Sequence, residues 1–266
     1  MESDIAEKVA KVKKLYPYLV EDLNNFKNQQ GEYKNKLQKM QDNPSDETRL
    51  QVDLPPIPFR GDIFGSKIAF VGLNVQAKKP LNFDLTKDGS IALDASPEQF
   101  IKLRLLNFQP RHHHEYFDKI IAFLKGYPGE FDSDWETLYN KVTTFEWIPY
   151  GSPHFGNIKR DHLGKHLQYL CDALKSFKTV IFAGAGFFEE LKHVDIVASE
   201  SKTVIFNKKN GQKNMSKSNY FREVIIPYDH GSINGIIISA FQRRKPFENE
   251  RYGEAIGKLM KPKVMY

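Results

Sequence analysis

Short apolar runs that end at turn residues constrain the fold of this chain most. They span residues 67–72, 145–150, 179–184 and 223–227, and we interpret each as a buried strand. Residues 161–177 lie between two of these runs and have apolar residues at helical spacing, namely Leu163, Leu167, Leu170, Leu174 and Phe177. Strands that alternate with helices predict an α/β fold with a mostly parallel central sheet flanked by helices.

A helical extension is predicted ahead of this domain. Apolar residues recur there in steps of four and three, which places them on one face of a helix: Ile5, Val9, Val12, Tyr16, Leu19, Leu23, Phe26, Tyr33, Leu37 and Met40. Pro17 is expected to kink or split the helix, and Gly31 is a second weak point. This apolar stripe either covers the main domain or pairs with another copy or another protein.

The domain boundaries follow from this pattern. We expect a helical N-terminal extension over residues 1–45, a linker rich in proline and turn residues over 46–60, and the α/β domain over 61–266. Residues 1–50 contain as many acidic as basic residues, so the formal charge of +6 comes from the rest of the chain. The extension is therefore expected to be dispensable for any chemistry of the domain.

Composition narrows the class of protein. The basic balance suits a polyanionic partner. No apolar run is long enough for a membrane span, and the N-terminus lacks the apolar core of a signal peptide. The one cysteine, Cys171, forms no intrachain disulfide and is interpreted as a small buried residue on a helix. This cysteine usage favours a reducing, intracellular location, cytoplasmic or nucleoid-associated.

No metal or cofactor site is predicted. His162 and His166 have the spacing of two ligands on one helix, but no third ligand is evident. The consecutive histidines 112–114 cannot share one face of a helix or strand. The glycines of Gly184-Ala185-Gly186 form only half of a dinucleotide-binding pattern.

Two segments stand at the ends of predicted strands. Val71-Gly72-Leu73-Asn74 ends the first run, and Pro227-Tyr228-Asp229-His230-Gly231-Ser232 ends the last. Because ligands bind at the carboxyl ends of parallel strands, we expect Asn74 and His230 to line one cavity.

The order and placement of these segments resemble the motifs of the uracil-DNA glycosylase superfamily, over residues 55–247. That superfamily has a water-positioning motif after its first strand and a His-Pro-Ser-Pro motif or a variant after its last. The resemblance implies a monofunctional DNA glycosylase that flips out uracil or a modified cytosine, as in phage DNA, and leaves an abasic site, in repair or antiviral defence. Val75, Gln76, Gly231 and Ile233 depart from the motifs, so the base is a different one or catalysis is lost. The alternative is a nucleic-acid-binding protein of this fold without catalysis.

The resemblance also implies roles for residues. Asn74 would hold a water near the sugar carbon, and His230 would donate a hydrogen bond to the leaving base. Asp229 is a second candidate to activate the water, or it orients His230. Other residues expected to line the substrate pocket are Gly72, Leu73, Phe83, Trp147, Tyr150 and Ser232. The three aromatic residues of that set either stack on a flipped base or pack in the core.

A basic stretch precedes the second motif. No acidic residue but several lysines occur between Ser201 and Arg222, and further cations follow the motif. We expect DNA phosphates to bind at these cations, named as Lys208, Lys209, Lys213, Lys217, Arg243 and Arg244. A third alternative is a protein that binds a small nucleotide, which would require Gly184-Ala185-Gly186 to line the main pocket.

Overall fold

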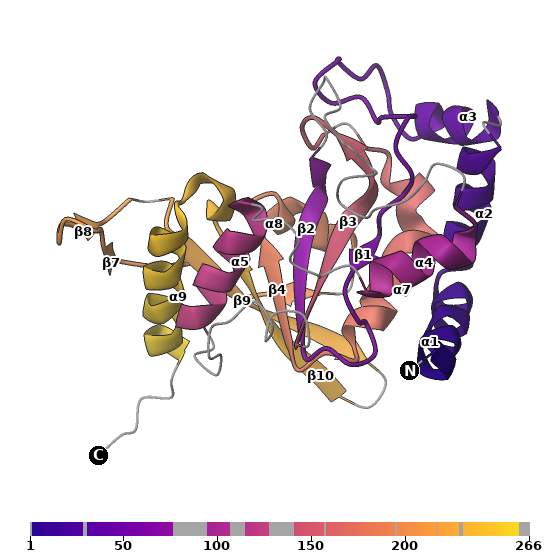
Figure 1. Ribbon diagram of the computed structural model, residues 1–266. Coiled ribbons are helices and arrows are strands. Elements are labelled where there is room, and N and C mark those ends of the chain that lie inside the picture. Colours follow the sequence, from indigo (N-terminus) through magenta and orange to yellow (C-terminus); the bar gives the residue numbers. More distant parts are fainter. Residues whose placement is uncertain are drawn as a thin grey trace. The chain divides into compact units, whose positions relative to one another are not determined.

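The computed structural model describes residues 2–28, 31–76, 95–106, 115–127, 141–156, 158–194, 196–216, 218–228 and 231–260 (Figure 1). The chain divides into two compact units. Unit 1 consists of Met1–Gln109 and Val142–Lys178, and unit 2 consists of Pro110–Lys141 and Thr179–Tyr266. Both units combine helices with strands, which confirms the predicted α/β class. None of the described helices is long and apolar enough to cross a membrane.

Unit 1 is built on a pair of long parallel strands. Its elements are α1 (Glu2–Leu15), α2 (Pro17–Lys27), α3 (Gly31–Lys39), β1 (Phe59–Arg60), β2 (Ile68–Gln76), α4 (Pro97–Leu106), β3 (Val142–Ser152), a 3-10 helix (Arg160–Leu163) and α7 (Gly164–Leu174). Strand β3 pairs with β2 in parallel and with the short β1 in antiparallel orientation. The predicted helical face of residues 161–177 is buried, and the two predicted strands are longer than expected.

The N-terminal helices belong to the core of unit 1. Pro17 is the first residue of α2 and Gly31 the first of α3, so both predicted weak points are helix starts. Val12, Tyr16 and Leu19 are fully buried, and the Tyr16 ring stacks on Phe59 of β1 at 6.1 Å between centroids. The apolar stripe thus covers the domain, the first of the two alternatives, and the expectation that this segment is dispensable loses its support.

The strands of unit 2 pair in both parallel and antiparallel orientation. The elements of this unit are α5 (Glu115–Gly126), β4 (Thr179–Ala183), α8 (Phe187–Glu190), a 3-10 helix (Leu191–His193), β5 (Val197–Ala198), β6 (Lys202–Thr203), β7 (Phe206–Asn207), β8 (Lys213–Asn214), β9 (Tyr220–Tyr228), β10 (Gly231–Ile238), a 3-10 helix (Phe241–Arg243) and α9 (Pro246–Met260). Strand β10 pairs in parallel with β4 and in antiparallel orientation with β9. The short β5 and β6 pair with β9, and β7 pairs with β8 in a separate hairpin.

The direction of β9 corrects the sequence prediction. We expected residues 223–227 to form a parallel strand, but they lie within β9, which is antiparallel to β10. Tyr228 ends β9, Gly231 begins β10, and these two residues are register partners. Within unit 2, β4 pairs in parallel with β10, a strand that was not predicted from the apolar runs. The second motif therefore lies at the amino end of β10, not at the carboxyl end of a parallel strand.

Helices α5 and α9 cross in close contact. A Cβ built on Gly126 would lie 2.2 Å from the carbonyl oxygen of Glu250, and one built on Gly253 would lie 2.5 Å from that of Phe123. Neither position has room for a side chain, because backbone atoms occupy the space. These glycines thus fix α9 in unit 2 by direct backbone contact.

Candidate functional site

Asn74 lies inside β2, near its carboxyl end, rather than in a loop after it. Its register partner in β3 is Ile148, and the register shifts at this point. The Asn74 amide nitrogen donates to the Ser152 hydroxyl at 2.7 Å and to the Ser152 carbonyl oxygen at 3.4 Å. The Ser152 hydroxyl in turn donates to the carbonyl oxygen of His154 at 2.7 Å. These bonds fix the orientation of the amide where β2 and β3 end.

Glu146 lies on the same strand pair and was not selected from the sequence. It is the register partner of Gly72, two residues before Asn74 along β2. Side chains of directly paired residues point to the same face of a sheet, and alternate residues share a face. Asn74 and Glu146 therefore lie on one face of the β2–β3 pair. Arg60 is paired with Thr144 and lies on that face as well.

The environment of Glu146 makes it a candidate acid. Burial raises the pKa of its carboxyl group to about 8, although the positive charge of Arg60 acts in the opposite direction. Its Oε2 atom is buried and has no hydrogen-bond partner among the described residues. A carboxyl group with this pKa is mostly protonated at neutral pH and can donate a proton. Glu146 could have been noticed in the sequence as a lone glutamate in an otherwise apolar strand. Glutamate is seldom buried without a function or a partner.

Two aromatic residues of the expected pocket are core residues instead. Trp147 is fully buried and Tyr150 is 2% exposed. The Tyr150 hydroxyl donates to Asp22 of α2 at 2.6 Å, so its polar end is occupied. Their packing role is the alternative that the structure supports. Gly72 is buried in β2, and Leu73 is half-buried.

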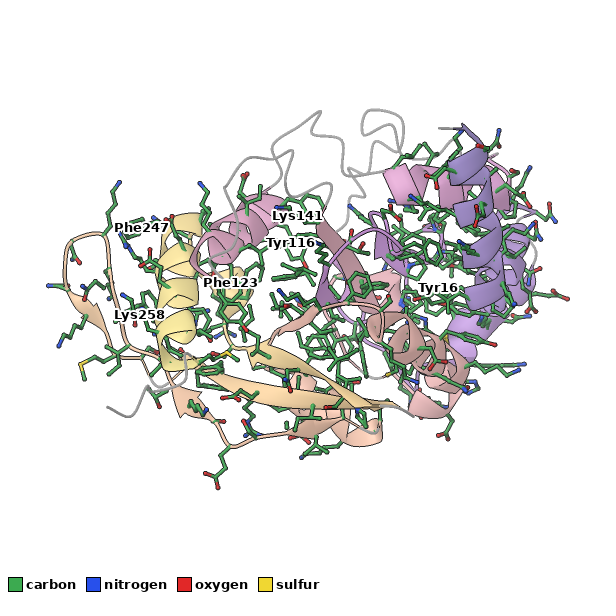
Figure 2. All side chains as sticks on the ribbon, turned by 90° about the horizontal axis from the view of Figure 1, so that it is seen from below. Tyr16, Tyr116, Phe123, Lys141, Phe247 and Lys258 are labelled. Carbon is green, nitrogen blue, oxygen red and sulfur yellow. The ribbon has the colours of Figure 1, made fainter. Side chains whose placement is uncertain are left out.

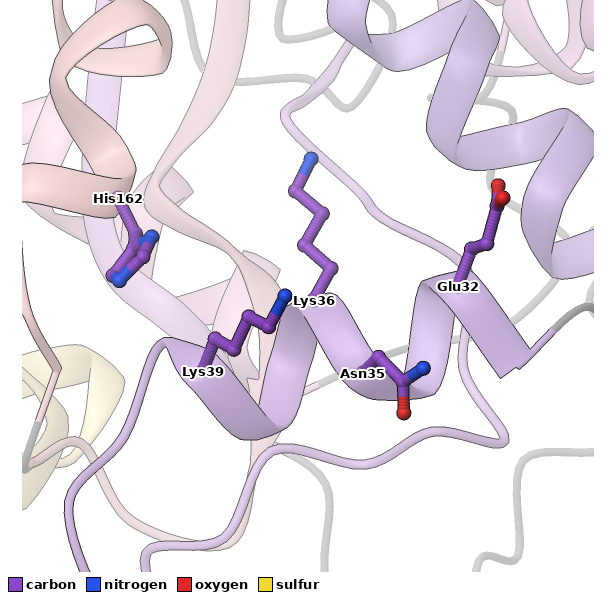
Figure 3. Close-up of a pocket in the computed structure, with 5 residues that line it drawn as sticks. All are labelled: Glu32, Asn35, Lys36, Lys39 and His162. Carbon is purple, nitrogen blue, oxygen red and sulfur yellow. The ribbon is translucent and has the colours of Figure 1, made fainter.

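Asp22 joins the N-terminal helices to β3. It is 1% exposed and accepts a hydrogen bond from the Lys36 ammonium of α3 at 2.6 Å, in addition to the bond from Tyr150. Burial, the largest effect, raises the pKa of the Asp22 carboxyl, while Lys36 lowers it. Lys36 also lines an open pocket of about 340 Å³, which Figure 3 shows with its other residues, Glu32, Asn35, Lys39 and His162.

His166 is a structural histidine in this unit. One ring nitrogen is bonded to the Tyr18 hydroxyl, and the other lies 3.0 Å from the carbonyl oxygen of Trp147. Burial lowers the pKa of His166 to about 4, so the ring is neutral at physiological pH. With both nitrogens engaged, His166 and His162 do not form a ligand pair. Within the described parts of the chain, no group of three His, Cys, Asp or Glu side chains could hold a metal ion.

The second motif is described only in part. Asp229 and His230 lie outside the described residues, as do Phe83 and Lys217. Ser232 is exposed in β10, opposite Pro227 of β9. We expect His230 beside Asn74 only if both residues follow strands that run in parallel. The strand before His230 is β9, and it runs antiparallel to β10, so this ground for the expectation is absent.

The basic residues of unit 2 separate into exposed and buried ones. Lys208, Lys209 and Lys213 are exposed on the β7–β8 hairpin, and Arg243 is exposed after β10. Arg244 is only 5% exposed, which contradicts its expected contact with DNA.

Arg244 instead anchors the segment after β10. Its guanidinium donates to the Ser239 carbonyl oxygen at 2.6 Å and to Asn219 at 2.8 Å. It also lies 3.7 Å above the centroid of the Tyr252 ring. An arginine held by these contacts stabilises the loop and α9 rather than binding phosphate.

A groove brings the hairpin lysines next to α9. Lys208 and Lys209 line it together with Arg251 and Lys258 of α9, in a volume of about 450 Å³. Gly184-Ala185-Gly186, which follows β4, lines neither this groove nor the pocket beside Lys36.

Comparison with known proteins adds no family to this description. No model of a known protein family matches the chain, and no curated protein matches it. The described residues that could carry chemistry or bind a ligand lie on the β2–β3 pair and in the basic groove.

Proposed function

We propose that this protein is a DNA glycosylase that hydrolyses the bond between a flipped, altered base and its sugar. The altered base is uracil or a modified cytosine, and the product is an abasic site. The observation that carries the proposal is the placement of Asn74 and Glu146 on one face of the β2–β3 pair, two register positions apart. The amide and the protonated carboxyl have the two properties that this hydrolysis requires.

The two side chains would have different tasks. Breaking the bond leaves positive charge on the sugar and negative charge on the base. Asn74, oriented by Ser152, would hold the attacking water near the sugar carbon. Glu146 would donate its proton to the leaving base as charge develops there and regain a proton from the water. The hydroxyl of the water ends on the sugar, and its remaining proton replaces the one given to the base.

A panel of DNAs, each with one altered base, tests the proposal. Abasic sites are read out by alkali cleavage after incubation with the protein. Asn74→Ala and Glu146→Gln should each slow excision by about a hundredfold or more, because a transition-state hydrogen bond is worth roughly 3–4 kcal/mol. The exposed Glu200→Gln is the matched control and should keep the rate.

Two results would refute the glycosylase proposal. One is an absence of cleavage across the whole panel. The other is full activity in both variants, which would separate the reaction from the β2–β3 face.

A nucleic-acid-binding protein without catalysis is the second candidate. It is favoured by the groove of unit 2, which is lined by cations without any contribution from Asn74 or Glu146. This candidate predicts DNA binding together with intact DNA throughout the panel.

A further inference from the structure

We infer that the groove between the β7–β8 hairpin and α9 binds single-stranded nucleic acid. One wall is a stripe along α9, formed by residues four, three, one and three positions apart, which share a helix face: Phe247, Arg251, Glu254, Ala255 and Lys258. The other wall comes from the hairpin and the residue before it, namely Ile205, Phe206, Asn207, Lys208, Lys209 and Gly211. Figure 1 shows the hairpin beside α9, and Figure 2 labels Phe247 and Lys258 towards opposite ends of that helix. The inference deepens the proposed function by naming the strand form of its nucleic acid.

Contacts between the hairpin and α9, and hydrogen bonds within the hairpin, fix both walls of the groove. Phe206 of β7 is 5% exposed and contacts the buried Tyr252 of α9 ring to ring, at 5.9 Å between centroids. The hairpin tip is closed by backbone bonds from Lys208 to Gln212 and from Gly211 to Lys208. Gly211 has φ of +79°, a left-handed conformation that favours glycine at this turn. The groove is therefore a preformed feature of unit 2.

The charge of the groove is strongly one-sided. Four cations line it against one carboxylate, and that carboxylate, Glu254, is already paired with Arg251 at 2.9 Å. Lys208, Lys209 and Lys258 are exposed and form no ion pair with any described residue. Unpaired ammonium groups on both walls attract a polyanion, and phosphate groups are the anions that follow one another along a chain.

Apolar surface between these cations selects the single-stranded form. Ile205 is 49% exposed, and the half-buried Phe247 ring lies 5.3 Å from the Arg251 guanidinium. Bases of a single strand can stack on such a ring while their phosphates meet lysines on either side. Bases in a duplex are stacked on one another and offer no free face to this ring, so the ring favours the single strand.

Binding to a labelled single strand of normal bases tests the inference on the full chain. The probe has about 12 nucleotides, within the usual site size, and the same sequence as a duplex is the comparison. We expect the single strand to bind more tightly. The binding constant falls with salt, and each phosphate contact on a single strand contributes roughly −0.7 to the slope of its logarithm against the logarithm of the salt concentration. The triple variant Lys208→Ala/Lys209→Ala/Lys258→Ala should therefore have a slope that is less steep by about 2. Phe247→Leu keeps an apolar side chain and should weaken single-strand binding about fivefold or more, with little effect on duplex binding.

A charge-matched variant separates the groove from overall charge. Lys14→Ala/Lys34→Ala/Lys102→Ala removes the same charge from exposed positions of unit 1 and should leave the salt slope unchanged. The inference is overturned if both triple variants behave alike, if the duplex binds as tightly as the single strand, or if an acidic peptide of equal charge displaces the strand equally well. The probe contains no altered base, so its binding does not depend on base excision. If the protein excised no base, the binding result would still stand. If the groove did not bind the strand, the excision assay with the Asn74 and Glu146 variants would still test the glycosylase proposal.

Discussion

The charged residues of the two units are used in opposite ways. In unit 1, Asp22 is almost fully buried and Glu146 has a buried carboxyl oxygen, Oε2, and the pKa of each group is raised. In unit 2, Lys208 and Lys258 are exposed on a groove and form no ion pair with a described residue. Burial makes a charge costly and couples it to folding, whereas exposure makes it available to a ligand and sensitive to salt.

This difference separates two kinds of experiment. A substitution at the buried groups of unit 1 should change the free energy of unfolding and its dependence on pH. A substitution at the groove of unit 2 should change affinity and its dependence on salt, with stability altered by less than about 0.5 kcal/mol. If the unit 1 variants changed the salt dependence of binding and the unit 2 variants changed stability, the two units would not differ in this way.

Deletion of residues 1–45 should have the largest effect. It removes the buried stripe that includes Val12, Tyr16 and Leu19 and exposes the surface of unit 1 beneath it. Each buried apolar side chain contributes about 1.5–3 kcal/mol, so the loss approaches the total stability of a typical domain, about 5–15 kcal/mol. We expect no cooperative thermal transition in unit 1, measured by near-ultraviolet circular dichroism. A truncated protein that unfolds cooperatively near the temperature of the full chain would show that the stripe is an accessory layer.

Patterns of apolar residues predicted much of this fold. The strand runs and the helix with Leu163 and Leu170 required only local periodicity, and Pro17 and Gly31 marked helix starts because backbone limits act locally. The direction of β9 could not be predicted in this way. An apolar strand has the same sequence pattern in a parallel and in an antiparallel pair, and its direction depends on the strand with which it pairs. We missed β10 because its polar start, Gly231 to Asn234, resembled a loop, and its glycine at 235 interrupts the apolar run.

The candidate sites were predictable to a smaller extent. Asn74 was selected because it follows an apolar run, and the exposed lysines because they cluster in sequence. Arg244 is buried and its neighbour Arg243 is exposed, and no sequence pattern distinguishes the two residues. Glu146 could be recognised only after the register with Gly72 was known, since its pKa depends on what surrounds it in three dimensions.

Glu146→Gln should remove a large pH dependence of stability. Between the ordinary pKa of a glutamate, near 4.5, and the folded value of about 8, the folded protein holds a proton that the unfolded chain has lost. Stability should therefore fall as pH rises through this window, by up to about 1.4 kcal/mol per pH unit, and level off above it. The glutamine variant lacks this loss and should be more stable than the parent protein at pH 8. Urea unfolding at pH 5, 6.5 and 8 measures the free energy of unfolding of both proteins. If this free energy depended on pH in the same way in both, Glu146 would not have the raised pKa.

Asp22→Ala should destabilise unit 1 by about 2 kcal/mol. The Tyr150 hydroxyl, which is buried, would lose its acceptor, and an unsatisfied buried polar group costs roughly 1–3 kcal/mol. Lys36 is partly exposed and can turn to solvent, which limits the cost. The matched control is Glu21→Ala, an exposed carboxylate next in the sequence, which should stay within about 0.5 kcal/mol of the parent. Equal denaturation midpoints for the two variants would show that the Asp22 contacts contribute no stability.

His230→Ala should have the smallest effect, less than about twofold on the excision rate, far below the loss expected at a group that stabilises a transition state. The residue falls between Tyr228 and Gly231, which pair across the antiparallel ladder of β9 and β10. That ladder continues from this pair through Ile238 and Phe221, so backbone bonds away from position 230 hold the hairpin. The carboxyl end of β10, where a ligand of parallel strands would be expected, is at Ile238 instead. Single-turnover excision by this variant and by Asn74→Ala, with the same DNA, decides between the two strand ends. If His230→Ala lost a hundredfold in rate while Asn74→Ala lost nothing, the chemistry would belong to the segment of the chain between β9 and β10, and the β2–β3 face of unit 1 would be left with its structural role alone.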